Sequence, residues 1–217
     1  MKKIALIHTV PTVYASFKDM LLKRIPDAII TNTVDEYLAS DAEVKGEFTK
    51  ENFRRLYSFI QCAEMTDPDV IAVTCSTLSP YVVKLRDLFK TPLVTIDELM
   101  IKSVVSKSSS ILIVSTAEST VLPTKGKLLK EAEVQSKTLN IDNIVCSEAY
   151  TAIKLRDKEK HDNLVLAAMK KVEKKYDAII LAQASMAHLE DQVKELLNSE
   201  VYSSPKFCIE NIVSVLK

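Results

Sequence analysis

The 217-residue sequence predicts an α/β fold made of two pseudo-symmetric halves, each built on a parallel sheet. Short, continuously apolar runs alternate with stretches of helical periodicity, a pattern typical of parallel strands covered by helices on both faces. The second observation is an internal repeat, in which a strand-like run and the polar residues after it recur about half a chain length later.

Seven apolar runs have the length and composition of buried strands. They span residues 4–7, 28–31, 70–74, 93–95, 111–114, 144–146 and 178–181. Between these runs, apolar residues recur at helical spacing, as in the set Phe53, Leu56, Tyr57, Ile60 and Ala63. We therefore expect strands and helices to alternate along the whole chain.

The repeat places Cys75 and Gln183 at equivalent positions. Residues 69–77 (DVIAVTCST) align with residues 177–185 (DAIILAQAS) at an offset of 183 − 75 = 108. Residues 4–9 (IALIHT) align with residues 111–116 (ILIVST) at an offset of 111 − 4 = 107, and residues 93–97 correspond to 201–205. The repeat predicts a first half of residues 1–98 plus 205–217 and a second half of residues 99–204.

Composition excludes several classes of function. Lys and Arg number 29, as do Asp and Glu, so the zero net charge gives no electrostatic reason to expect nucleic acid or a membrane as partner. No apolar run approaches the roughly 18 residues of a membrane span, and no signal peptide is recognisable, so a cytoplasmic protein is expected. Only two glycines are present, which excludes glycine-rich dinucleotide and phosphate loops.

The four cysteines lie far apart and lack the spacing of metal ligands. In a chain of this length we expect them to be reduced thiols, without a disulfide framework or a metal site. They are Cys62, Cys75, Cys146 and Cys208.

Small polar residues follow the predicted strands where each strand ends. Ligands of open α/β sheets bind outside the carboxyl ends of the strands. If the two halves face each other, these residues converge on one cleft, where helix N-termini favour a small anion such as a carboxylate. The predicted set is His8, Thr9, Cys75, Ser76, Thr77, Ser115, Thr116, Gln183 and Ser185.

Four segments resemble the aspartate/glutamate/hydantoin racemase superfamily, and most closely its branch with Cys-Ser-Ser/Thr-Leu and Leu-Ala-Gln-Ala-Ser-Met motifs. They are residues 73–80 (VTCSTLSP), 96–100 (IDELM), 115–124 (STAESTVLPT) and 181–187 (LAQASMA). The resemblance extends over nearly the whole chain. It implies a cofactor-independent enzyme with one cysteine in each half, in which one thiolate removes a Cα proton and the other thiol returns one. A homodimer is expected by the same analogy.

Some functional positions of the family are matched in this chain, and others hold a different residue. Cys75 falls at the first-half cysteine, and Thr77 falls at a threonine that binds the substrate carboxylate. Gln183 stands where the second cysteine is expected, and His8 with Thr9 replaces the Asp-Ser pair of glutamate racemases. One of the two proton-transferring groups is therefore missing from its expected place.

The residue types suggest distinct roles. Cys75 is expected to begin a helix capped by Ser76, Thr77 or Ser79, whose N-terminus would favour the thiolate that acts as base or nucleophile. His8 could be the second proton carrier or could orient Cys75. Gln183 cannot exchange protons at neutral pH, but with Ser185 it could hold a carboxylate. The plainer alternatives are a buried structural thiol, strand-end hydrogen bonds and a helix cap.

Several functions remain open at this level. The first is a racemase- or isomerase-like enzyme acting on a small carboxylate or amino-acid-type substrate. One-cysteine variants of the superfamily are decarboxylases, and cis–trans isomerisation through a thiol adduct is a further option. A different class is a non-catalytic binder of a small acidic metabolite. The sequence does not identify the substrate.

Overall fold

The computed structural model describes the backbone of residues 1–217 and every side chain except that of Thr12. The chain divides into two compact units. Unit 1 comprises Met1–Leu99 and Pro205–Lys217, and unit 2 comprises Met100–Ser204. The chain leaves unit 1 within helix α5 (Glu98–Lys107) and re-enters it at the start of helix α10 (Ser204–Val215).

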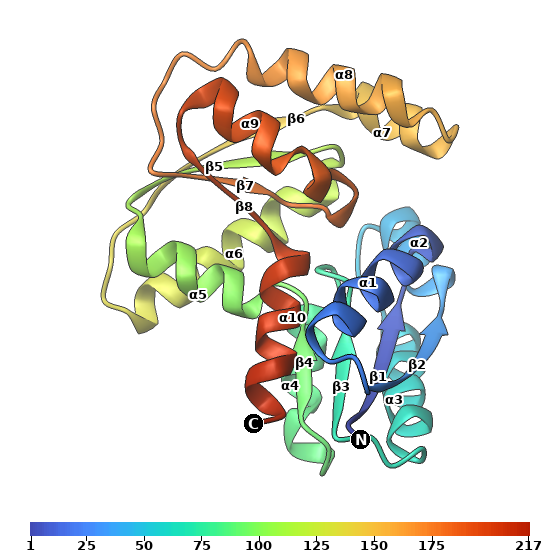
Figure 1. The fold of residues 1–217 in the computed structure, drawn as a ribbon. Coiled ribbons are helices and arrows are strands. Elements are labelled where there is room, and N and C mark those ends of the chain that lie inside the picture. The colour runs from blue at the N-terminus through green and yellow to red at the C-terminus, as the bar shows by residue number, and fades with distance from the viewer. The chain divides into compact units, whose positions relative to one another are not determined.

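Unit 1 contains a four-stranded parallel sheet in the order β2-β1-β3-β4 (Figure 1). The two inner strands are β1 (Lys3–His8) and β3 (Val70–Val73), and the edge strands are β2 (Ile29–Val34) and β4 (Leu93–Thr95). All four residues of β3 are buried, because helices cover both faces of a parallel sheet. The carboxyl ends of these four strands lie along one edge of this sheet.

The helices of unit 1 begin at recognisable signals. Pro11 occupies the first turn of α1, and the side chain of Asp35 caps α2 by accepting from the backbone N–H of Tyr37. Thr49 caps α3, and Gly46 ends α2 in the left-handed conformation. The elements are α1 (Pro11–Arg24), α2 (Glu36–Lys45), α3 (Lys50–Glu64), α4 (Ser79–Leu85) and η1 (Arg86–Leu88).

One apolar cluster of unit 1 joins the sheet to helices α2, α3 and α4. Leu56 and Ile60, one turn apart on α3, are fully buried against Ile71 and Val73 of β3 within one apolar cluster. Burial of each such side chain is worth about 1.5–3 kcal/mol. The cluster also includes Leu78, and Cys75 packs against it.

Unit 2 repeats this topology. Its four parallel strands have the order β6-β5-β7-β8 (Figure 1), with bounds β5 (Ser110–Ser115), β6 (Asn140–Val145), β7 (Ala178–Leu181) and β8 (Glu200–Ser203). The register repeats as well, since Ile4 pairs with Val70 in unit 1 and Ile111 pairs with Ala178 in unit 2. The internal repeat of the sequence therefore corresponds to two sheets of the same strand order and register.

The helices of unit 2 are α6, α7, α8, the 3₁₀ helix η2 and α9, in addition to most of α5. Their core cluster unites Val165 and Met169 of α8 with Ile179 and Leu181 of β7. The bounds are α6 (Glu118–Val134), α7 (Ser147–Lys154), α8 (Lys158–Met169), η2 (Ala184–Leu189) and α9 (Glu190–Leu197). In the part of the chain that the structure describes, no helix has the length and apolar character needed to cross a membrane.

An aspartate braces the amino-terminal edge of each sheet. Asp69 accepts a hydrogen bond from the backbone N–H of Lys3 at 2.7 Å, and Asp177 accepts from the backbone N–H groups of Ser109 and Ser110 at 2.9 Å each. These backbone hydrogen bonds lower the pKa of Asp177. The two aspartates precede β3 and β7 at equivalent places in the repeat, so this aspartate-to-backbone hydrogen bonding is part of what the two units share.

The predicted fold class of two parallel-sheet α/β halves is confirmed. The expected runs at 93–95 and 178–181 match β4 and β7, whereas the run at 144–146 covers only the end of β6. The run at 28–31 stops three residues before the end of β2, and β8 was not among the expected runs. The misplaced bounds fall on edge strands, which are less buried than the inner ones.

Candidate active site

Each sheet has one partly exposed polar segment directly beyond an inner strand. In unit 1 this segment is residues 75–77, two positions after β3, and in unit 2 it is residues 183–185, two positions after β7. The strands themselves are fully buried, so these segments are where the inner strands give way to accessible side chains. Both lie at the edge where α/β sheets bind ligands.

Cys75 differs from the other three cysteines in its surroundings. It is half-buried against the core of unit 1 at the carboxyl end of β3, and its backbone carbonyl accepts a hydrogen bond from the backbone N–H of Leu78. Cys62 is exposed in the last turn of helix α3 and does not follow a strand. Burial raises the pKa of the Cys146 thiol, and burial with the nearby Asp97 carboxylate raises that of Cys208. Cys75 is thus the cysteine best placed to meet a ligand.

The prediction that Cys75 begins a helix is wrong. Helix α4 begins at Ser79, has only seven residues, and is preceded by a turn; no side chain caps it. The Ser79 hydroxyl instead donates to the buried carboxylate of Asp97 at 2.7 Å, and its oxygen lies 3.4 Å from the Cys75 carbonyl. This bond ties the start of α4 to the residues after β4, so the Cys75 turn is held by neighbouring strand ends.

His8 links three strand ends in unit 1. Its ring is fully buried, with Nδ1 2.7 Å from the hydroxyl of Thr74 and Nε2 3.0 Å from Oδ1 of Asn32. Because Asn32 Oδ1 can only accept, Nε2 carries the proton in the neutral ring and Nδ1 accepts from Thr74. Tyr14 and Phe17 meet the ring edge-to-face, each with ring centres 6.2 Å apart. Both ring nitrogens therefore form hydrogen bonds within unit 1, and one of the two partners, Thr74, directly precedes Cys75 in the chain.

Burial makes unit 1 sensitive to pH through His8. Burial lowers the pKa of His8 below its ordinary value of 6.5, although the hydrogen bond to Asn32 works in the opposite direction. A lowered folded-state pKa means that the unfolded chain binds the proton first. The associated stability is full above pH 6.5 and is lost as the pH falls below it.

A His8→Gln variant is expected to reveal this dependence. The difference in free energy of unfolding between the natural chain and the variant should be larger at pH 8 than at pH 5. Urea denaturation at both values measures it. An equal difference at the two pH values would show that the fold does not favour the neutral form of the His8 ring over the protonated form.

The remaining predicted residues of unit 1 differ in access. Thr9 is buried immediately after His8, whereas Ser76 and Thr77 are partly exposed beside Cys75. Ser76 and Thr77 are thus the hydroxyl residues that unit 1 presents with the thiol.

In unit 2, the residues after β5 and β7 are bonded to each other. The side-chain oxygen of Gln183 accepts from the backbone N–H of Thr116 at 2.6 Å and from the Thr116 hydroxyl at 3.0 Å. The Ser115 hydroxyl donates to the carbonyl of Ala117 at 2.6 Å and lies 3.4 Å from the same Gln183 oxygen. Ser115 and Thr116 are buried, and their hydroxyls donate to the carbonyl of Ala117 and to Gln183 respectively. Ser185 is partly exposed within η2.

A cluster of titratable side chains near the start of α8 was not predicted. Asp162 lies 2.7 Å from Nδ1 of His161, Nε2 of His188 and Nζ of Lys158. Burial alone would raise the pKa of Asp162, but the hydrogen bonds from these three residues outweigh it and bring the pKa to about 2. The cluster joins α8 to η2, the segment that follows Gln183. Nothing in the spacing of His161 and His188 along the sequence indicates that they share a partner.

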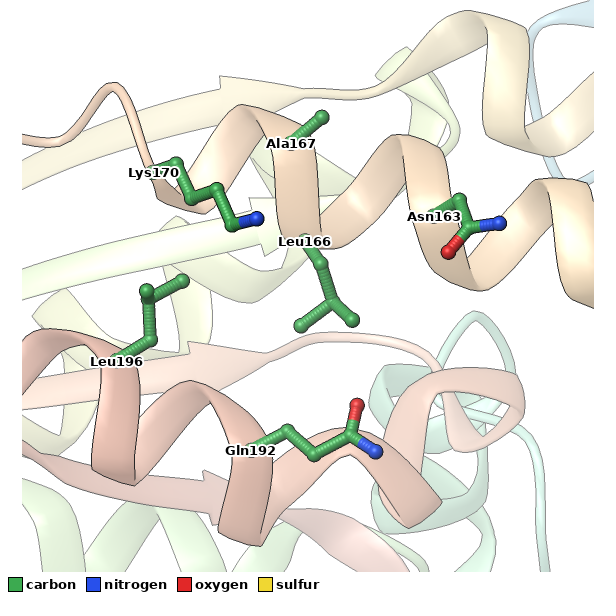
Figure 2. Close-up of a pocket in the computed structure, with 6 residues that line it drawn as sticks. All are labelled: Asn163, Leu166, Ala167, Lys170, Gln192 and Leu196. Carbon is green, nitrogen blue, oxygen red and sulfur yellow. The ribbon is translucent and has the colours of Figure 1, made fainter.

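Two other observations concern ligands. Among the residues that the structure describes, no three His, Cys, Asp or Glu side chains are grouped so that they could hold a metal ion. A shallow groove runs between α8 and α9 (Figure 2), lined by Asn163, Leu166, Ala167, Lys170, Gln192 and Leu196. It contains none of the predicted site residues, so the strand ends remain the candidate site.

The sequence matches the family model described as Asp/Glu/Hydantoin racemase over residues 9–211. No curated protein matches it by sequence. The structure is similar to that of aspartate racemase from Picrophilus torridus, with a TM-score of 0.75, 17% identity, and coverage of 100% of this chain and 95% of that chain.

Two further solved structures are similar in fold. For a glutamate racemase isoform of Bacillus anthracis, the TM-score is 0.72 at 13% identity, covering 99% of this chain and 81% of that one. For a mutant of the maleate cis–trans isomerase of Nocardia farcinica, which has a covalently bound succinylcysteine intermediate, the TM-score is 0.55 at 14% identity, covering 99% and 92%. At these identities the likeness establishes the fold alone.

Proposed function

Because the chain belongs to the Asp/Glu/hydantoin racemase family, we propose that it is a cofactor-independent racemase- or isomerase-type enzyme acting on a small carboxylate or amino-acid-type substrate. The thiolate of Cys75 is its base or nucleophile. The observation that carries the proposal is the position of Cys75, half-buried at the carboxyl end of β3 with Ser76 and Thr77 beside it. A thiol in this position meets a ligand where α/β sheets bind them.

The chemistry of a thiolate suits a substrate with an activated Cα–H bond. A carboxyl or amide group next to Cα acidifies that hydrogen, so a positioned thiolate can remove it. The electron pair left on Cα is then delocalised into the carboxyl group, and return of a proton completes the exchange. The hydroxyl of Thr77 and the backbone or hydroxyl of Ser76 are the donors in unit 1 that would hold the carboxylate.

His8 has the orienting role in this proposal. Its two ring nitrogens are bonded to Thr74 and Asn32, so a proton exchange with substrate would require one of these bonds to break. Held as it is, the ring fixes Thr74 and therefore the backbone that leads directly into Cys75. His8 acts through Thr74 as a positioning residue, without contact with the reacting atoms.

The names of the structurally similar proteins support a small carboxylate as the substrate. Two of the similar structures are named as aspartate and glutamate racemases, and a third carries a succinylcysteine intermediate. These names describe acidic amino acids and a four-carbon diacid bonded to a cysteine sulfur. They favour a small substrate with at least one carboxylate for this chain, with Cys75 acting either on a proton or on a carbon atom.

A second candidate function follows from Gln183. The residue occupies the position equivalent to Cys75 in unit 2, and an amide side chain cannot give or take a proton at neutral pH. Decarboxylation followed by protonation from one side needs only one proton donor. A one-cysteine decarboxylase-type enzyme is therefore the alternative, and a non-catalytic binder of a small acidic metabolite is the outcome if Cys75 proves inert.

Hydrogen exchange at Cα separates these functions. We expect at least one member of a panel of amino acids, hydantoins and malonates to exchange its Cα hydrogen in deuterated water, followed by NMR. Exchange with inversion indicates a racemase, and loss of carbon dioxide indicates a decarboxylase. Absence of any reaction across the panel, with tight binding of a member, would leave only the binder.

A further inference from the structure

The amide of Gln183 is asymmetric in its bonding. Its oxygen accepts two hydrogen bonds from Thr116 and lies close to the Ser115 hydroxyl. Among the described residues, no protein atom accepts from its nitrogen. The side chain is partly exposed, so the uncommitted end of the amide lies at an accessible position beyond β7.

The backbone N–H of Thr116 fixes which end of the amide points inward. An N–H group can only donate, and the 2.6 Å contact therefore requires an acceptor opposite it. Rotating the amide by half a turn would set an NH₂ group against that N–H, two donors facing each other. The oxygen must consequently point toward Thr116, which is buried, and the NH₂ group must point away from it.

The neighbouring side chains of the segment do not accept a hydrogen bond from this NH₂ group, so it can donate to a ligand. Ala184, the next residue, has no polar side chain, and Ser185 is the next hydroxyl along the segment. The two N–H bonds of the amide can only donate, so a matching ligand atom must be an acceptor. A carboxylate oxygen is the strongest such partner among small metabolites, because charge shortens and strengthens the hydrogen bond.

We propose that Gln183 is a locked hydrogen-bond donor that binds a carboxylate or carbonyl oxygen of the ligand and takes no part in proton transfer. This rests on the proposed function, since the ligand is the same small carboxylate. It adds a specificity element: the ligand carries an acceptor oxygen for Gln183, whose place in the repeat corresponds to that of Cys75.

The Gln183→Glu substitution tests the proposal with little change of shape. One carboxylate oxygen can accept from Thr116 and Ser115 as the amide oxygen does, so the fold is preserved. The other oxygen replaces the NH₂ donors with an acceptor and a negative charge. We expect the affinity for malonate, succinate or aspartate, whichever the natural chain binds, to fall about 100-fold or more in calorimetric titration.

Two variants control for charge and for folding. Gln192→Glu makes the same chemical change on an exposed position of α9, and it should leave affinity within about twofold of the natural chain. Gln183→Leu removes the donors without adding charge, and it also removes the acceptor of the Thr116 N–H. In folded protein it should lower affinity about tenfold, less than the glutamate variant. If the glutamate variant does not fold, as judged by circular dichroism and melting temperature, the leucine variant decides the question.

The outcomes separate this inference from the proposed function. Unchanged affinity in a folded Gln183→Glu variant, while the natural chain still binds a carboxylate and reacts with it, would overturn the donor role and leave the function standing. Failure of the natural chain to bind any of the three probes overturns both. Loss of Cα exchange in the leucine variant without loss of affinity would also contradict a purely binding role.

Discussion

A Cys75→Ser variant is expected to lose about 10²–10⁴-fold of any Cα exchange or turnover that the natural chain shows. A serine hydroxyl is nearly isosteric with the thiol, yet it is far less acidic and stays protonated near neutral pH, so it is a poor base and nucleophile. Cys75 is half-buried, and among the described residues no hydrogen bond involves its sulfur, so the fold should be unaffected. NMR of the responsive substrate in deuterated water measures the loss.

Cys62 provides the matched control for this substitution. It is exposed on α3, outside the segments that follow the inner strands, so Cys62→Ser should retain full activity. Iodoacetamide should modify both Cys62 and Cys75 in the natural chain, but the substrate should protect only Cys75, as peptide mass spectrometry would show. Full activity in the Cys75→Ser variant would remove the thiol from the mechanism.

Truncation of Ile71 or Ile179 to alanine is expected to lower the free energy of unfolding by about 2–5 kcal/mol in each case. Both side chains are fully buried, in the equivalent inner strands β3 and β7, and both belong to the apolar cores of their units. Each truncation leaves a cavity that neighbours in a parallel sheet can fill only in part. Because the positions are equivalent in the repeat, the two losses should be similar in size.

Urea denaturation followed by circular dichroism measures both losses. Val44→Ala is the control, since Val44 is 86% exposed on α2 and its truncation should change the free energy by less than about 0.5 kcal/mol. A loss below 1 kcal/mol for either isoleucine would contradict the described core. Separate transitions for the two units would show which unit each variant weakens.

The inner strands were predictable because burial on both faces makes them continuously apolar. Runs such as 178–181 leave no other interpretation, and the repeat gave the equivalence of Cys75 and Gln183. Edge strands were harder to place: β6 reads Asn-Ile-Asp-Asn-Ile-Val, with polar residues that a half-exposed strand tolerates. The family predicted from the motifs was confirmed as well.

The contacts within the site were not predictable from local pattern. The bond between Gln183 and Thr116 joins residues 67 positions apart, and it exists because β5 and β7 are neighbours in the sheet. The link from His8 to Thr74 depends in the same way on β1 lying beside β3. The start of α4 was misjudged because Ser76 and Thr77 have the residue types of a helix cap but lie in a turn.

The aspartate braces have a consequence for how this protein can be altered. Asp69 and Asp177 secure the sheets at the edge opposite to the strand ends that bear Cys75 and Gln183. In each sheet, the residues that stabilise the fold at one edge are therefore separate from the candidate functional residues at the other edge. Residues 75–77 or 183–185 could therefore be replaced while the aspartate hydrogen bonds at the opposite edge keep the strands of each sheet in register. The chain is a scaffold in which the functional residues of each unit can be redesigned separately.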